Sequence, residues 1–166
     1  MSTRTTEAPW LSMQDRFLRL AIRGLQILPE EFARGLACLV GWFLSEILRS
    51  RRKIIEQNLQ TAFGDRLTHE EVVHIRQQSW INLILTGMEM LRFPRHKERY
   101  LDMLTVVGFD EIEKSLSAGH GVIFVSAHMG NWEIGASYLA PQAPFAVIAR
   151  PLNPKGGGRV LDAIRR

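Results

Sequence analysis

Cysteine, clustered metal ligands and long apolar runs are scarce in this chain. Cys38 is the only cysteine among its 166 residues, which rules out an intramolecular disulfide, and its apolar neighbours predict a small buried side chain. His69 and His74 lie five residues apart on an expected helix and therefore diverge, so no metal site is predicted. The N-terminal residues lack the pattern of a secretory signal.

The first third of the chain is apolar and basic. Residues 10–28 carry apolar side chains at helical spacing with arginines between them, which is typical of a basic amphipathic helix. Residues 32–48 are more apolar, but charged residues bracket a run shorter than the roughly 20 residues of a membrane span. The cationic stretch 49–53 follows, and the net charge is +4. These features favour helices on or shallowly within an anionic membrane surface, with a weak single span or ordinary core helices as alternatives.

Helix signals continue through the middle of the chain. Residues 58–63 are expected to close one helix, with Gly64 as its cap. Thr68 and Glu71 have the spacing of a capping box that opens the next helix. Pro94 is expected to stop that helix and to leave a charged connector behind it.

Three short runs rich in apolar residues predict strands. They cover residues 104–107, 122–125 and 145–149, and a helix is expected over residues 109–118 between the first two. Alternation of strands and helices predicts an α/β fold, in which the N-terminal membrane-associated helices precede a largely parallel sheet with flanking helices.

A histidine and a carboxylate follow the second of these runs. His128 ends the apolar run, and Glu133 comes five positions later. On one continuous helix the two side chains would point apart. They can meet where His128 lies in a loop that Gly130 allows to turn tightly and Glu133 lies in the first helical turn. A histidine, whose unperturbed pKa is about 6.5, can then activate a substrate hydroxyl as a general base. The spacing alone is more typical of an ordinary strand–loop–helix connection with a surface histidine and a glutamate at the helix start.

The neighbouring residues carry a more specific pattern. His128-Met-Gly-Asn-Trp-Glu133 resembles the His-x-x-x-x-Asp/Glu motif of the lysophospholipid acyltransferase superfamily, and most closely the late acyltransferases of lipid A biosynthesis. Residues 149–154 are similar to that branch's Arg-Pro-x-x-Asn-Pro segment, with one residue fewer. Residues 51–63 resemble its Arg-Arg-x-x-x-x-Asn-Leu-x-x-Ala-Phe pattern. The tract 156–158, three glycines, departs from the family's path and favours a flexible loop.

The resemblance implies an acyl transfer to a lipid hydroxyl. His128 would be the base, and Glu133 would orient it and stabilise its charged form. Backbone N–H groups around Gly130 and Asn131 would stabilise the oxyanion of the tetrahedral intermediate.

Two residues of the second motif complete the implied site. Arg150 would hold a phosphate of the donor or acceptor, and Asn153 would contribute to substrate binding. The implied partners are a membrane glycolipid acceptor, the membrane surface, and an acyl thioester of acyl carrier protein or coenzyme A. No metal, no further cofactor and no nucleic acid is expected. The implied location is the cytoplasmic face of the inner membrane.

The resemblance also implies how the chain is organised. Residues 1–53 would be membrane-associated helices, and residues 54–166 the N-terminal part of an acyltransferase α/β domain, because the resemblance reaches only the N-terminal half of the family's pattern. A catalytically incomplete fragment that binds membrane or carrier protein is therefore the main alternative. A thioesterase, in which His128 activates water, and a basic nucleic-acid-binding domain are weaker alternatives.

Overall fold

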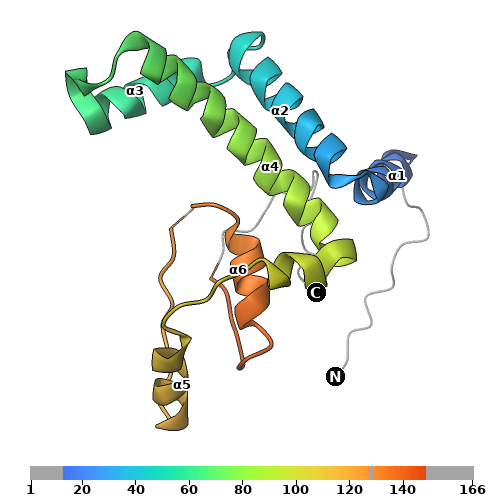
Figure 1. Cartoon of the computed structure of the whole chain (residues 1–166), viewed down its shortest axis with the longest axis vertical. Helices are drawn as coiled ribbons and strands as arrows, with labels where there is room; N and C mark the ends of the chain where they lie inside the picture. Colours follow the sequence, from blue (N-terminus) through green and yellow to red (C-terminus); the bar gives the residue numbers. More distant parts are fainter. Residues whose placement is uncertain (1–12, 128, 149–166) are drawn as a thin grey trace. The chain divides into compact units, whose positions relative to one another are not determined.

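The computed structural model describes residues 13–127 and 129–148. Helices and irregular segments make up this part of the chain (Figure 1). In order, they are α1 (Met13–Ile27), α2 (Glu30–Glu46), α3 (Arg52–Phe63), the short 3-10 helix η1 (Gly64–Arg66), α4 (His69–Asp102), α5 (Phe109–Ser117) and α6 (Trp132–Leu139). The chain divides into two compact units, Met1–Arg92 and Phe93–Arg166. The predicted boundary between residues 53 and 54 falls within α3, and the roles assigned to its two sides stay predictions.

The helix ends in unit 1 follow the predicted signals. Gly64 caps α3 with a φ of 59°, a left-handed value that glycine adopts without steric cost. The capping box before α4 is confirmed: the Thr68 N–H donates to the Glu71 carboxylate at 2.8 Å, and the Glu71 N–H donates to the Thr68 hydroxyl at 3.3 Å. The Thr68 N–H, followed by its hydroxyl, lowers the pKa of Glu71 below its ordinary value.

The helix predicted to stop at Pro94 continues two residues further. Its backbone leaves helical geometry at His96, with φ −120° and ψ 24°, and a second helical segment follows this kink to Asp102. Pro94 has no N–H and cannot donate to the carbonyl four residues earlier, which weakens the helix just before the kink. The charged residues that follow the proline are therefore helical rather than a connector.

The predicted α/β fold with a largely parallel sheet is also wrong. Within residues 13–127 and 129–148 there is no strand, and residues 104–107, 122–125 and 145–148 have no regular secondary structure. Their side chains were expected to be buried, yet Val107 and Ile123 are 90% and 92% exposed. A β-branched run favours extended backbone, but a strand also requires a neighbouring backbone that accepts its hydrogen bonds.

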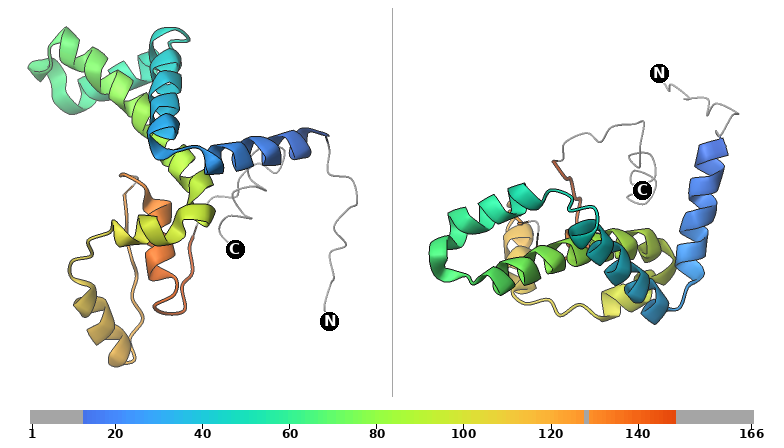
Figure 2. Two further views of the ribbon diagram at one scale, coloured as in Figure 1. Left: turned by 45° about the vertical axis from the view of Figure 1, so that its right-hand side comes forward. Right: turned by 90° about the horizontal axis from the view of Figure 1, so that it is seen from above.

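Close contact between α2 and α4 organises unit 1. These helices lie side by side in Figures 1 and 2, and Gly41 of α2 meets the backbone of Ile81 in α4. A methyl group built on Gly41 would lie only 2.6 Å from the Ile81 Cα atom. The absence of a side chain at residue 41 therefore allows the two helix backbones to approach this closely.

A buried arginine holds the end of α1. Arg92, near the end of unit 1, is 3% exposed, and its guanidinium donates to the carbonyl of Leu25 and, at 2.8 Å, to that of Leu28. Carbonyl groups at the C-terminus of a helix lack partners within the helix and carry partial negative charge. A cation that is satisfied by them can therefore be buried. Gln26 adds a 2.8 Å bond to the Leu91 carbonyl.

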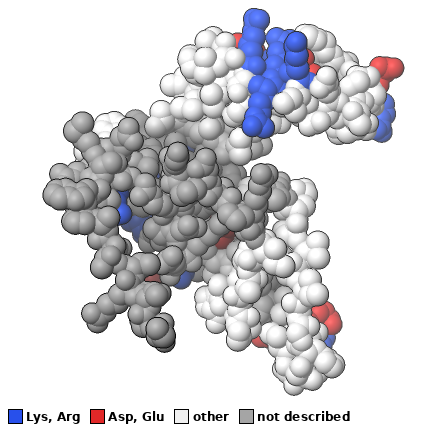
Figure 3. All heavy atoms as spheres, turned by 180° about the vertical axis from the view of Figure 1, so that it is seen from behind, with Lys and Arg blue, Asp and Glu red and all other residues white. Residues whose placement is uncertain are grey.

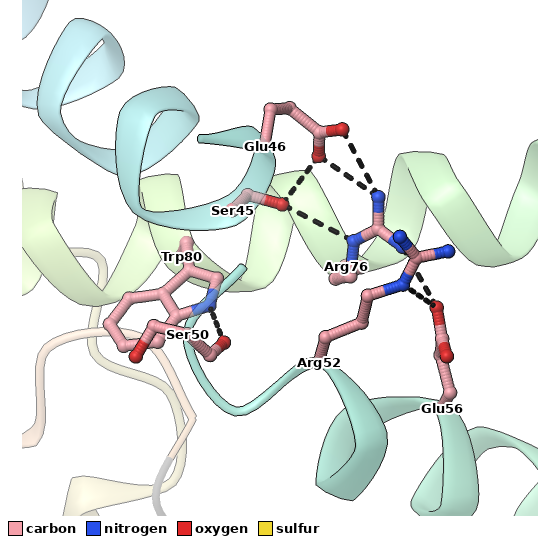
Figure 4. A network of polar contacts seen from close by, with 7 residues as sticks. All are labelled: Ser45, Glu46, Ser50, Arg52, Glu56, Arg76 and Trp80. Carbon is pink, nitrogen blue, oxygen red and sulfur yellow. Dashed lines mark hydrogen bonds and ion pairs between the residues drawn. The ribbon is translucent and has the colours of Figure 1, made fainter. Parts of the chain in front are cut away.

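A polar network links α2, α3 and α4 (Figure 4). Arg76 of α4 is 3% exposed at its side chain and lies 3.0 Å from Glu46 and 2.8 Å from Glu56. Arg52 approaches the same Glu56 oxygen at 2.8 Å, and Ser45 donates to Glu46 at 2.7 Å. One buried cation thus neutralises carboxylates from two other helices, which fixes their positions on α4.

The contacts in this network shift the acidity of both carboxyl groups. The Ser45 hydroxyl, followed by Arg76, lowers the pKa of Glu46, and Arg52, followed by Arg76, lowers the pKa of Glu56. A lowered carboxyl pKa stabilises the fold at pH values above the unfolded pKa. That stabilisation is lost as the pH falls through the lower, folded value.

We expect Arg76→Met to destabilise the protein by about 1–3 kcal/mol at pH 7, because Glu46 and Glu56 would lose their buried counter-charge. Urea unfolding at pH 7 and below pH 4 measures the effect. The difference in free energy of unfolding between the wild type and Arg76→Met should shrink at the lower pH, where the carboxylates become protonated. Lys53→Met, at an exposed cation of α3, is the control and should change stability by less than about 0.5 kcal/mol. An equal loss in both variants would contradict the role of the network.

The turn between α2 and α3 is strained and firmly held. Arg49 and Arg51 have φ values of 48° and 53°, left-handed values that typically cost a non-glycine residue about 1–3 kcal/mol. Ser50 lies between them, and its N–H donates to the Leu44 carbonyl at 3.0 Å. The Ser50 carbonyl in turn accepts a 3.0 Å bond from the indole N–H of Trp80. These bonds hold the turn in a conformation that arginine does not favour.

Two further observations concern the apolar side chains. Cys38 is exposed, so the prediction that it is buried is wrong. None of the helices in the described part of the chain is both long and apolar enough to cross a membrane.

In unit 2 the buried apolar side chains include Phe93 and Ile134. The ring of Phe109 in α5 contacts that of Tyr138 in α6 edge-on, with centroids 6.0 Å apart.

Candidate functional site

The predicted catalytic motif reaches α6 through a tight turn. Gly130 has a φ of 58°, so the prediction that glycine permits a sharp turn here is confirmed. Asn131 is the N-cap of α6, with non-helical φ and ψ of −104° and 83°. Its carbonyl accepts the first bond of the helix, from the Gly135 N–H at 3.4 Å. The backbone therefore changes from loop to helix within the motif itself.

Glu133 lies in the first turn of α6, as the sequence predicts. A carboxylate at this position complements the partial positive charge that the N-terminus of a helix carries. The side chain is half-buried, and the Glu133 carbonyl accepts a 2.8 Å bond from the Ser137 hydroxyl one turn later. Ile134, the next residue, is buried at 5% exposure and anchors this turn in unit 2.

The structure brings three of the six predicted site residues to one junction. Gly130, Asn131 and Glu133 lie within four consecutive residues at the start of α6. His128, Arg150 and Asn153 lie outside the described residues, as does the tract 156–158. The pairing of His128 with Glu133, and the binding roles of the two later residues, therefore stay predictions.

The predicted oxyanion site coincides with the N-terminus of α6. The first N–H groups of a helix have no partner within the helix and point along its axis. α6 begins between Gly130 and Glu133, so the start of the helix lies within the predicted motif. The roles predicted for these residues, stabilising an oxyanion and orienting a base, stay predictions.

Sequence reasoning missed the residues that hold unit 1 together. Arg76 was not singled out, although an arginine among apolar helix positions signals a buried ion pair when carboxylates are available nearby. The close packing of α2 was also missed. Its signal is a small residue at every fourth position, namely Ala33, Ala37, Gly41 and Ser45, all of which are buried.

One of the comparisons with known proteins identifies a family. A family model described as bacterial lipid A biosynthesis acyltransferase matches residues 9–160 of the chain. No curated protein and no solved structure matches it. The matched range contains all six predicted site residues and both structural units, apart from their outermost residues.

Proposed function

The chain belongs to the bacterial lipid A biosynthesis acyltransferase family, and from this we propose that it transfers a fatty acyl group from an acyl thioester to a hydroxyl of a membrane glycolipid such as a lipid A precursor. The observation that carries the proposal is the family match over residues 9–160. The turn at Gly130 and the start of α6 support it, because they provide the loop-to-helix geometry that the motif needs.

In the proposed reaction His128 removes the proton from the acceptor hydroxyl. The oxygen attacks the thioester carbonyl, and the tetrahedral oxyanion is stabilised by backbone N–H groups around Gly130 and Asn131. This attack forms the ester C–O bond, and collapse of the intermediate restores the carbonyl and breaks the C–S bond. The departing thiolate takes from His128 the proton that the acceptor hydroxyl lost, and leaves as a free thiol. Glu133 acts throughout as a positioning residue for the imidazole.

The two later residues of the proposed site bind rather than react. Arg150 would pair with a phosphate of the donor or acceptor, since its planar guanidinium can donate two parallel hydrogen bonds to phosphate oxygens. Asn153, three residues after Arg150 in the same motif, would contribute to substrate binding. The donor would be acyl carrier protein or coenzyme A thioester, and the reaction would take place at the cytoplasmic face of the inner membrane.

Acyl transfer by the purified chain tests the proposal. A labelled acyl thioester, either on carrier protein or on coenzyme A, is mixed with detergent-dispersed lipid A precursor, and both labelled lipid and free thiol are measured. We expect labelled lipid and free thiol to appear in equal amounts and only when the acceptor is present. Thiol release without acceptor would indicate a thioesterase instead. The absence of both products would identify the 166-residue chain as a catalytically incomplete member of the family.

A further inference from the structure

Helix α2 packs on unit 1 through its smallest side chains. The buried residues of the helix recur every four positions and so share one face, namely Ala33, Ala37, Gly41 and Ser45. On this face Gly41 meets the backbone of Ile81 in α4. The contact with α4 therefore leaves the large apolar side chains of α2 on the opposite face.

These large side chains form one line along α2. They are here called the outer stripe and comprise Phe32, Leu36, Leu39, Val40, Phe43 and Ile47. Val40 is half-buried, and the other five are between 39% and 69% exposed. The stripe runs for about 22 Å along the helix axis. A continuous line of exposed apolar side chains indicates a surface that a partner covers.

The spacing of the outer stripe is the same in both directions. From Phe32 to Ile47 the steps are four, three, one, three and four residues, so the pattern is symmetric about its midpoint. A two-fold axis through this midpoint places Phe32 of one copy opposite Ile47 of the other, and Leu36 opposite Phe43. Apolar side chains three and four residues apart are also those that interlock between packed helices. A second, antiparallel copy of α2 is thus complementary to the whole stripe, whereas a lipid surface requires no register.

The two ends of α2 carry opposite charges. Glu31 is exposed in the first turn of the helix, and Arg49 and Arg51 are exposed in the turn that follows the helix. Figure 3 shows a group of Lys and Arg side chains on the part of unit 1 that holds the start of α3, bordered by uncharged surface. In the symmetric antiparallel register Glu31 lies opposite residue 48 of the second copy, next to Arg49. A parallel pair would instead bring like charges together, which is unfavourable.

The exposed area of the outer stripe sets the expected strength of such a contact. Its five exposed side chains present on the order of 400 Å² on each copy. Trp42 and Leu48, beside Phe43 and Ile47 in the sequence, are 45% and 59% exposed and would add to the covered area. Specific interfaces cover about 800 Å² on each partner, and transient ones cover less. A contact of this size should therefore be reversible.

We propose that the outer stripe is the interface of a homodimer, in which two copies of α2 pack antiparallel about a two-fold axis. Such a contact uses the same surface on both copies, so it closes after two chains and leaves no open end for further association. The exposed carboxylate at one end of each helix then lies beside the cations at the end of the other. The proposal goes beyond the proposed function, and its tests need neither an acyl donor nor an acceptor.

Sedimentation velocity of the full chain without lipid, over concentrations from about 1 µM to 1 mM, tests the proposal. We expect a monomer–dimer equilibrium with a Kd of about 10–100 µM. Leu39→Ser with Phe43→Ser should weaken dimerisation at least tenfold and leave the helical content unchanged, because both side chains are exposed. Phe17→Ser with Leu20→Ser makes the same chemical changes at exposed positions of α1 and should dimerise as the wild type does. Equal weakening in both double variants would overturn the role of the stripe.

Exchange of charges tests the antiparallel orientation. Glu31→Arg alone places cations together at both ends of the interface, and Arg49→Glu alone does the same with carboxylates. Each should weaken dimerisation about tenfold at low salt. A mixture of the two single variants restores opposite charges in the heterodimer and should recover the wild-type affinity. Single variants that dimerise normally would overturn the antiparallel register.

Two results with the wild type would overturn the homodimer itself. One is a chain that stays monomeric up to about 1 mM. If this monomer bound phosphatidylcholine vesicles and Leu39→Ser with Phe43→Ser abolished the binding, lipid rather than a second copy would cover the stripe. The other is association that continues beyond dimers, because a two-fold contact closes. His128→Ala should dimerise normally, so a loss of acyl transfer in that variant would bear on the proposed function alone.

Discussion

Replacement of His128 by alanine should lower the rate of acyl transfer by about 10²–10⁴-fold, the range that a positioned general base typically contributes. The reason is that the acceptor hydroxyl is a poor nucleophile until its proton is removed. If His128 acts only on the chemical step, kcat should fall while the KM for the thioester changes little. Initial rates of labelled lipid formation at several donor concentrations separate the two parameters.

His120→Ala is the matched control for this variant. His120 is exposed and lies eight residues before His128, outside the motif, so its replacement should leave transfer unchanged. Glu133→Gln keeps the size of the side chain and removes its charge, and we expect a smaller loss of kcat than for His128→Ala. Far-UV circular dichroism checks that α6 stays folded, since a first-turn carboxylate also stabilises a helix. Acceptor-dependent transfer that persists in His128→Ala would remove His128 from the mechanism.

Helix ends were predictable from sequence because their signals are local. The capping box of Thr68 and Glu71 and the glycine cap at Gly64 involve residues within a few positions of each other, and both are present in the structure. The turn at Gly130 and the helical position of Glu133 were predicted for the same reason. Pro94 shows the limit of a local signal. The break in α4 comes two residues after it, at His96, and a second helical segment then reaches Asp102.

The strands were not predictable because a strand is not a local structure. The β-branched run at residues 122–125 sets a preference for extended backbone, but pairing depends on residues far away in sequence. In the described residues this run finds no pairing partner, and Val125 is 89% exposed. The burial of Cys38 was wrong for a related reason. An apolar helix shows that burial is favoured but does not show which side of the helix packs.

Gly41 decides which side of α2 packs, and Gly41→Ala should therefore destabilise the protein by about 3 kcal/mol, at the upper end of the range for overpacking. The added methyl group would lie 2.6 Å from the Cα atom and 2.8 Å from the backbone nitrogen of Ile81. Backbone atoms within a helix cannot turn aside as a side-chain end can, so α2 and α4 would have to move apart. Urea unfolding monitored by circular dichroism measures the loss.

Gly35→Ala is the matched control because it makes the same chemical change in the same helix. Gly35 is exposed, and a methyl group built on it would meet no atom within 4 Å. Alanine favours the helix over glycine by about 1 kcal/mol, so Gly35→Ala should stabilise the protein by up to that amount. The two substitutions should therefore have opposite signs. If Gly41→Ala also stabilised the protein, α2 would not pack on α4 through its small face.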